Sequence, residues 1–117
     1  MRHRRKNRRL NFYSAQRKSV LRTMTVSLIK EESVNTTDAR AKEVKRYAES
    51  IINLSKEDSL NNRRMAFTKL RDKDAVKKMF GPLHDRYQER DGGYIRIFHT
   101  GFRRGDAAKM CMLKLVN

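Results

Sequence analysis

The sequence contains one cysteine, one proline and no tryptophan among its 117 residues. The single thiol, Cys111, excludes an intramolecular disulfide, which is typical of proteins of reducing compartments. No apolar run approaches the roughly 20 residues that span a bilayer. The basic N-terminus also lacks the apolar stretch of a secretory signal. We therefore expect a cytoplasmic protein with no membrane partner.

Negative charge is scarce, and it is absent from the start of the chain. The sequence has 13 Asp and Glu against 29 Lys and Arg, which gives a net charge of +16. Residues 1–30 contain ten of the basic residues, and the first carboxylate is Glu31. A charge this one-sided opposes compaction through self-repulsion unless an anionic partner neutralises it. The pattern favours nucleic acid as that partner.

Residues 1–9 are the most basic stretch of the chain. Six of the nine are Lys or Arg, and none is acidic. Such a segment buries too little apolar surface to fold alone, whereas its guanidinium groups bind phosphates bidentately. We expect residues 1–13 to form a basic extended RNA-binding arm, and residues 14–117 to form a single α+β domain. The candidate contact residues of the arm are Arg2, His3, Arg4, Arg5, Lys6, Arg8 and Arg9.

Apolar residues recur at helical spacing in four segments after the arm. The predicted helices cover residues 15–30, 38 to about 54, about 59–70 and about 73–80. Their candidate N-caps are Ser14, Thr37 or Asp38, Asp58 or Ser59, and Asp72. In the third helix the residues expected to face inward in part are Leu60, Met65, Ala66, Phe67 and Leu70. Gly81 and Pro82 stop the fourth helix, and residues 83–90 are compatible with a further helix or a loop.

Three segments have the character of strands. Residues 33–37 are rich in β-branched side chains, and residues 94–99 alternate, with Ile95 and Ile97 on one face and Arg96 on the other. As a strand, residues 109–116 would place Cys111, Leu113 and Leu115 on one face. A turn-rich connection over residues 100–108 makes the last two an antiparallel hairpin. The order helix, strand, three helices, two strands predicts an α+β fold of two layers, with helices on one face of a small three-stranded sheet. The open face would carry Arg96 and Lys114.

Several basic residues outside the arm are candidates for phosphate contact. They lie on the polar faces of the first two helices, on the third helix, on the sheet and in the hairpin loop: Arg17, Lys18, Arg22, Lys42, Arg63, Arg64, Arg96, Arg103 and Arg104. In the loop, two glycines allow close approach of a partner, and Phe102 either stacks on that partner or folds back onto the core. Asp106 is expected to brace this loop.

Little in the sequence indicates catalysis or a cofactor. The three histidines have no helical pairing and no cysteine at metal-ligand spacing, so we expect no metal and no small-molecule substrate. A small ribonuclease using His99 with Arg103 and Asp106 remains an alternative, because RNA hydrolysis needs only a proton shuttle and a cation. Cys111 is expected to be a small core residue. A DNA- or RNA-binding regulatory protein is the other alternative.

Taken together, the motifs resemble one family, the bacterial large-subunit ribosomal protein numbered seventeen. The matching stretches follow one another along nearly the whole chain: Met1 to Arg4, Arg8 and Leu10, Thr36-Thr37, Ala41 to Glu43, Asn62 to Arg64, Ala66-Phe67, Gly92 to Tyr94, Arg96-Ile97, Gly101 to Arg103, Gly105-Asp106 and Met110. The chain departs from the family pattern at Phe12, Gln16 and Lys109, which affects individual arm contacts.

This resemblance implies a structural, non-enzymatic role. It predicts a constituent of the large ribosomal subunit that binds and stabilises large-subunit ribosomal RNA near the exit of the peptide tunnel. Its implied partners are that RNA and neighbouring large-subunit ribosomal proteins, and its implied location is the cytoplasmic ribosome. Because most donors are Lys and Arg suited to the backbone, we expect RNA shape to be recognised more than base sequence.

Overall fold

The computed structural model describes residue 10 and residues 12–117, and it combines helices with one small sheet. The elements follow in the order α1 (Ser14–Glu31), β1 (Ser33–Thr37), α2 (Asp38–Ile52), the 3-10 turn η1 (Asn53–Lys56), α3 (Leu60–Leu70), α4 (Lys73–Phe80), α5 (Pro82–Tyr87), β2 (Ile95–Phe102) and β3 (Lys109–Leu115). The expected α+β class is confirmed. Residues 83–90, for which the sequence allowed either a helix or a loop, begin within α5, and the first residue of that helix is Pro82.

Two of the predicted N-caps are made by side chains. Ser59 accepts a hydrogen bond from the backbone N–H of Asn62 at the start of α3, and Asp72 accepts one from Ala75 at the start of α4. The prediction of Ser14 is wrong by one residue, because Tyr13 is the cap and Ser14 lies inside α1. The amide oxygen of Gln16 accepts from the Tyr13 N–H, so the third helical residue caps this end from within.

The core lies between the sheet and the helices. Its largest fully buried side chains are Tyr87, Tyr94, Leu21, Leu28, Ile29, Ile51, Ile52, Leu70, Met79, Leu83, Ile95 and Leu113. In α3 only Ala66 and Leu70 are buried, whereas Leu60, Met65 and Phe67 are exposed, so most of the inward positions expected there are wrong. A helix at the rim of a small domain contacts the core along a narrow stripe, and the rest of its apolar residues face outward.

The three strands form an antiparallel sheet in the order β1, β3, β2. The last strand is therefore central, with Thr36 and His99 as the neighbours of Cys111 on its two sides. Cys111, Leu113 and Leu115 face the core as predicted, and Arg96 and Lys114 are exposed. The β2–β3 pairing shifts register between His99 and Gly101, which marks a bulge near the end of β2.

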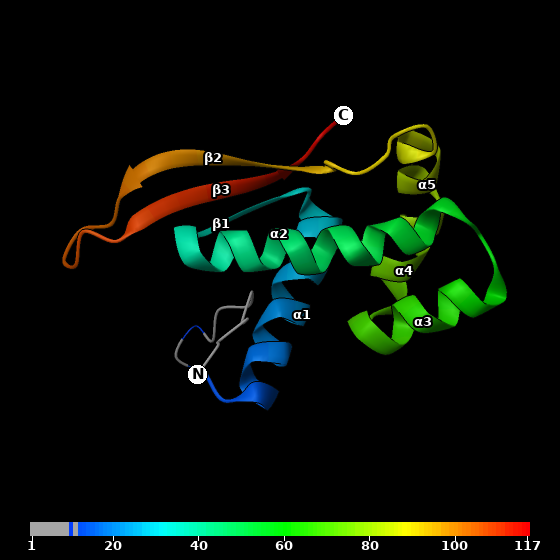
Figure 1. Ribbon diagram of the computed structural model, residues 1–117, viewed down its shortest axis with the longest axis horizontal. Coiled ribbons are helices and arrows are strands. Elements are labelled where there is room, and N and C mark those ends of the chain that lie inside the picture. The colour runs from blue at the N-terminus through cyan, green and yellow to red at the C-terminus, as the bar shows by residue number, and fades with distance from the viewer. Residues whose placement is uncertain (1–9, 11) are drawn as a thin grey trace, which may run out of the picture.

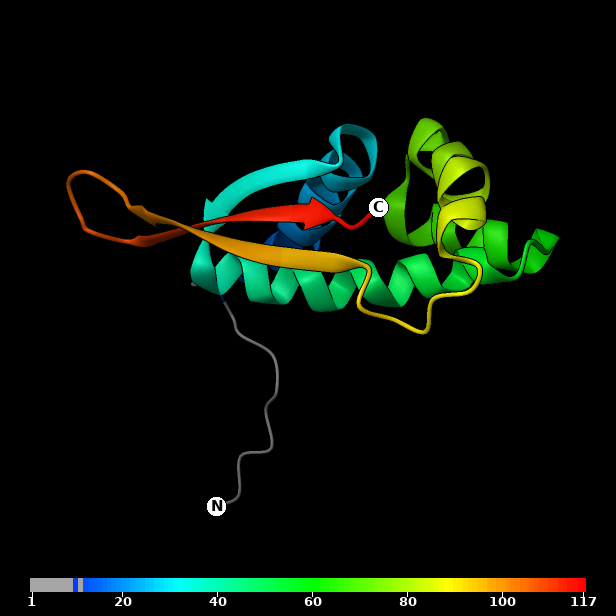
Figure 2. The ribbon, with the colours of Figure 1, turned by 90° about the horizontal axis from the view of Figure 1, so that it is seen from above.

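The helices cover one face of the sheet (Figure 1). α2 runs beneath the strands, α1 crosses it steeply, and α3, α4 and α5 gather around the C-terminal end of α2. Seen from above, the β2–β3 hairpin extends beyond the start of α2, at the end of the molecule away from those short helices (Figure 2). The fold thus presents an open sheet face, a projecting loop and exposed helix surfaces.

Candidate nucleic-acid interface

The open sheet face brings two cations opposite each other. Arg96 on β2 and Lys114 on β3 are directly paired in the register, and both are exposed. Like charges at opposed positions of neighbouring strands repel each other, and an anion between them removes that repulsion. Phe98, one position along on the same face, is 44% exposed. These three side chains line part of a shallow hollow of about 270 Å³.

The hairpin loop carries an exposed aromatic ring and two arginines. Phe102 is 71% exposed, which excludes the alternative in which it folds back onto the core. Arg103 is held by Asp106 through two N–H···O bonds of 3.1 and 2.6 Å. Asp106 also accepts from the Ala108 N–H at 3.2 Å, so it braces the loop as expected. The Arg103 guanidinium, followed by that backbone N–H, lowers the pKa of Asp106 to about 2.

Arg104 is the loop cation that remains available. It is exposed, and among residues 10 and 12–117 it has no ion-pair or hydrogen-bond partner. Arg103, by contrast, donates two of its N–H groups to Asp106 and adds little net charge to the surface. The loop therefore offers Arg104 and the Phe102 ring to a partner, with Arg103 as their support.

On α3 the adjacent arginines differ in the same way. Arg63 donates to both carboxylate oxygens of Asp58, at 2.6 and 2.8 Å, and its guanidinium lies 5.3 Å from the centre of the Phe80 ring. Its pKa is raised by the hydrogen bonds to Asp58. Arg64 is exposed and, within the described part of the chain, without such a carboxylate. Arg63 thus joins the start of α3 to α4, and Arg64 faces solvent.

The predicted basic face of α1 is divided by its contacts. Arg17 forms an ion pair of 2.7 Å with Glu43, a residue of α2 that is almost completely buried. Arg22 donates through Nε to the backbone oxygen of Lys69 at 3.2 Å, so it joins α1 to α3. Lys18 is exposed with no partner among residues 10 and 12–117. Of the three, only Arg17 is paired with a carboxylate; Arg22 is held by a neutral backbone oxygen, and Lys18 is the one that faces solvent without a bond to the described residues.

The remaining predicted contacts fall into two groups. Lys42 on α2 is half exposed and pairs with Asp38 at 3.2 Å, one helical turn earlier. Arg2, His3, Arg4, Arg5, Lys6, Arg8 and Arg9 lie outside the described residues.

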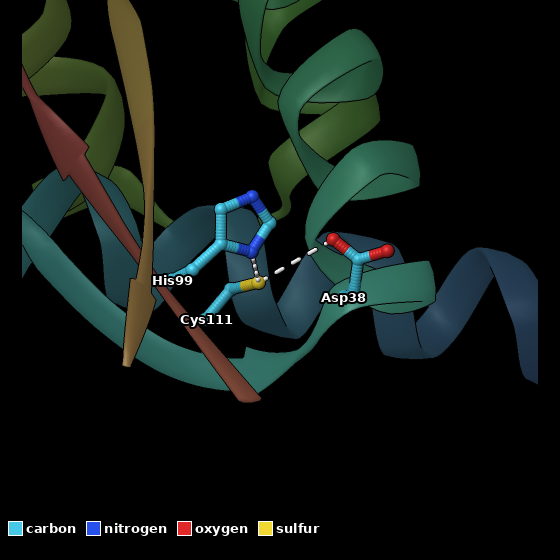
Figure 3. A group of neighbouring side chains, drawn as sticks. All are labelled: Asp38, His99 and Cys111. Atoms are coloured by element: carbon cyan, nitrogen blue, oxygen red, sulfur yellow. Dashed lines mark hydrogen bonds between the residues drawn. The ribbon is translucent and has the colours of Figure 1, made fainter. Parts of the chain in front are cut away.

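His99 belongs to a cluster that the sequence did not reveal (Figure 3). Its Nδ1 lies 3.4 Å from the Cys111 sulfur, and the thiol donates to Asp38 across another 3.4 Å. The ribonuclease hypothesis needed His99 to act with Arg103 and Asp106, but those two residues bind each other in the loop. Residues 95, 97 and 99 lie on the same face of the hairpin as residues 111, 113 and 115. This alternation would have predicted the His99–Cys111 pair if the register of the two strands had been known.

Among the residues that the structure describes, no helix is both long enough and apolar enough to cross a membrane.

Comparison with protein families adds a finding that covers most of the chain. The family model described as Ribosomal protein L17 matches residues 20–116, which run from the first turns of α1 to the end of the sheet. The match therefore includes α3, the open sheet face and the hairpin loop, where the uncompensated cations Arg64, Arg96 and Arg104 lie. We conclude that the chain belongs to the ribosomal protein L17 family, a family of structural proteins of the large ribosomal subunit.

Proposed function

We propose that this protein binds and stabilises large-subunit ribosomal RNA near the exit of the peptide tunnel, as a component of cytoplasmic ribosomes. In this role the protein catalyses no reaction. Folded RNA brings phosphates into close proximity, and their mutual repulsion limits how tightly RNA helices pack. A protein that inserts fixed cations between them removes part of that repulsion and releases counterions to solvent.

The observation that carries the proposal is the placement of Arg96 opposite Lys114 on the uncovered face of the sheet. Two opposed cations destabilise the free protein slightly and are relieved by a bound phosphate. Phe98 beside them offers an exposed ring on which an unpaired base can stack. A surface of this kind suits a phosphate backbone with an adjacent splayed nucleotide.

The proposed contact residues divide by role. Lys18, Arg64, Arg96 and Arg104 contact phosphates directly from the folded body, together with the arm residues of the first nine positions. Arg17, Arg22, Lys42, Arg63 and Arg103 hold helices and the hairpin loop in place through bonds to their own chain. Substitution of the second group should affect stability and RNA binding together, whereas substitution of the first should affect RNA binding alone.

Exposed apolar side chains on α3 support contact with a neighbouring ribosomal protein. Leu60 is 65% exposed, and Met65 and Phe67 are each 42% exposed. Large apolar groups concentrated on one helix are more typical of a protein interface than of an RNA backbone contact.

Sedimentation tests the assignment to the large subunit. Lysate is fractionated at low magnesium so that the subunits separate, washed at high salt, and probed for this protein. We expect co-migration with the large subunit that survives the wash. Recovery in ribosome-free fractions, or with DNA, would contradict the proposal.

Binding to purified ribosomal RNA tests the sheet face. The double variant R96Q/K114Q should lower the slope of log affinity against log salt by roughly 1.4 to 1.8 units, because each phosphate contact contributes about 0.7 to 0.9. The control is K73Q/K77Q, which removes two exposed lysines of α4 and the same charge. Equal changes in the two double variants would show that net charge alone, and not this face, determines binding.

A further inference from the structure

Three potential metal ligands meet at the root of the β2–β3 hairpin, although they lie far apart in the sequence. Asp38 is the first residue of α2, while His99 and Cys111 are paired across β2 and β3. The register also pairs Cys111 with Thr36 on its other side, two residues before Asp38. The central strand therefore places its thiol between the strand that precedes α2 and the strand that carries the imidazole (Figure 3).

We propose that Asp38, His99 and Cys111 form a binding site for a divalent transition-metal ion, with Zn²⁺ as the best fit. A thiolate, an imidazole and a carboxylate are the three ligand types that zinc takes in proteins, whereas Mg²⁺ and Ca²⁺ prefer oxygen ligands alone. This site is independent of the RNA-binding role.

The distances suit a tetrahedral ion. Zinc bonds of about 2.3 Å to sulfur and about 2.0 to 2.1 Å to nitrogen or oxygen place neighbouring ligand atoms roughly 3.3 to 3.6 Å apart. The sulfur of Cys111 lies 3.4 Å from His99 Nδ1 and 3.4 Å from Asp38 Oδ1. All three ligand atoms lie within 4.8 Å of one another. Small side-chain rotations bring them around one ion.

A second layer of contacts orients the carboxylate. Lys42 Nζ lies 3.2 Å from Asp38 Oδ2, while Oδ1 faces the thiol. One oxygen is thus held by the lysine, and the other is directed at the place of the metal. Hydrogen bonds to the outer atoms of ligands are what fix ligand orientation in protein metal sites.

The same contacts argue against a nucleophilic role for Cys111. A catalytic thiol needs an environment that favours the thiolate, usually a histidine whose far nitrogen is held by a carboxylate. Here the carboxylate of Asp38 lies beside the sulfur, and burial followed by the hydrogen bond to Asp38 raises the pKa of Cys111. The sulfur is also completely buried. A metal cation would instead be attracted by both acidic groups, and it would displace the thiol proton.

The site is open on one side, as metal entry requires. His99 is exposed and the Asp38 side chain is 21% exposed, whereas Cys111 forms the buried floor. Solvent water has access to complete the fourth position. Bound metal would tie the first turn of α2 to both strands of the hairpin, and so would steady the base of the loop that carries Arg104.

Metal titration of the full-length protein tests this proposal. The protein is stripped with chelator and titrated with Zn²⁺ in competition with a chromophoric chelator, and Co²⁺ is used as a spectroscopic probe. We expect one ion per chain and an intense thiolate-to-cobalt charge-transfer band. Each of D38N, H99Q and C111S should weaken binding by more than about 100-fold, since even outer-layer changes cost 10- to 100-fold.

The matched control is H84Q, which changes a histidine of α5 whose Nδ1 contacts the backbone oxygen of Ser55, and it should leave metal binding unchanged. Circular dichroism checks that each variant is folded. If C111S unfolds, the cobalt band of the wild-type protein still shows whether the thiolate binds the metal. The affinity is then compared in D38N and H99Q, which change more accessible groups. Absence of stoichiometric binding, a cobalt spectrum without a thiolate band, or equal weakening by H84Q and H99Q would overturn the proposal.

Discussion

Glu32 is the residue on which three helices converge. It ends α1 in the left-handed region, with φ of 64°, and accepts from Arg86 of α5 through both oxygens at 2.9 and 3.2 Å. Lys78 of α4 lies 3.2 Å from the same carboxylate. The hydrogen bond from Arg86, ahead of that from Lys78, lowers the pKa of Glu32 below its ordinary value of 4.5. One half-exposed carboxylate thus links α1 to both short helices.

Substitution of Glu32 by Gln should destabilise the protein by about 1 kcal/mol at neutral pH, because the variant loses charge-assisted hydrogen bonds. Since the folded pKa is depressed, this stabilisation is complete above the unfolded value of 4.5 and is lost as the pH falls through the folded pKa. Urea unfolding at neutral and at acidic pH measures the difference.

The control for this substitution is E31Q, which changes the preceding, exposed glutamate. We expect little effect from E31Q at either pH, and convergence of E32Q with the wild-type protein in acid. A deficit in E32Q that persists below the folded pKa would show that the substitution acts through packing or backbone strain, and not through the ion pairs.

Individual arginines show where reasoning from sequence ends. Arg63 and Arg64, or Arg103 and Arg104, are equivalent in the sequence, and all four were expected to contact phosphate. In the structure a carboxylate holds the first member of each pair. Such a partner depends on side-chain direction, which spacing alone does not determine, and for Arg17 the partner is Glu43 on another helix.

At the scale of elements, the β2–β3 hairpin depends on one backbone position. Gly101 follows the register shift after His99 and has φ of +133°, a conformation that side chains with a Cβ adopt at a cost. An added Cβ would meet nothing within 4 Å, so the cost comes from the backbone and not from a clash. The bulge thereby turns the end of β2 toward the loop.

We expect the variant G101A to lower the free energy of unfolding by about 1 to 2 kcal/mol, the usual cost of a strained backbone position. The control T100A changes the adjacent exposed residue and should lower the free energy of unfolding by only a few tenths of the loss expected for G101A. Urea unfolding gives the stability, and amide exchange across β3 locates the weakening. Equal stability of the two variants would mean that the hairpin rearranges to accommodate alanine.

Periodicity and caps predicted most elements, but not their contacts across the chain. The sequence offered Asp58 or Ser59 as the cap of α3 and Asp72 as the cap of α4, because short polar side chains there precede an apolar period, and the structure has Ser59 and Asp72. It could not place His99 beside Cys111, since that depends on the hairpin register. Nor could it separate inward from outward apolar residues in α3, because helix packing decides which stripe is covered.

At the scale of the whole molecule, charge is unevenly compensated. Four of the nine ion pairs in the described part of the chain lie in a band from α1 through α4 and α5 to α3: Lys30 to Asp72, Lys78 to Glu32, Arg86 to Glu32, and Arg63 to Asp58. By contrast, Arg96 and Lys114 on the sheet have no carboxylate partner among those residues. The open sheet face therefore carries uncompensated positive charge that can bind an anion.

The arm should contribute the largest single share of the salt dependence of RNA binding. Deletion of residues 1–9 removes six Lys and Arg, yet it leaves every residue of the described core in place. We expect an unchanged midpoint of thermal unfolding and a decrease of the log-log salt slope by up to about 4 to 5 units, at 0.7 to 0.9 for each phosphate contact. Filter binding to ribosomal RNA over a range of salt concentrations measures the slope.

A second variant separates charge from chain length. Replacing the six basic arm residues by Gln keeps all 117 residues and removes the same charge as the deletion. If the arm acts by neutralising phosphates, the slope of log affinity against log salt should decrease by the same amount in both variants. Counterion release depends on the charge of the arm and not on the presence of its chain. A slope that stays at the wild-type value in both variants would assign RNA binding to the folded body, with Arg96 and Lys114 as its principal contacts.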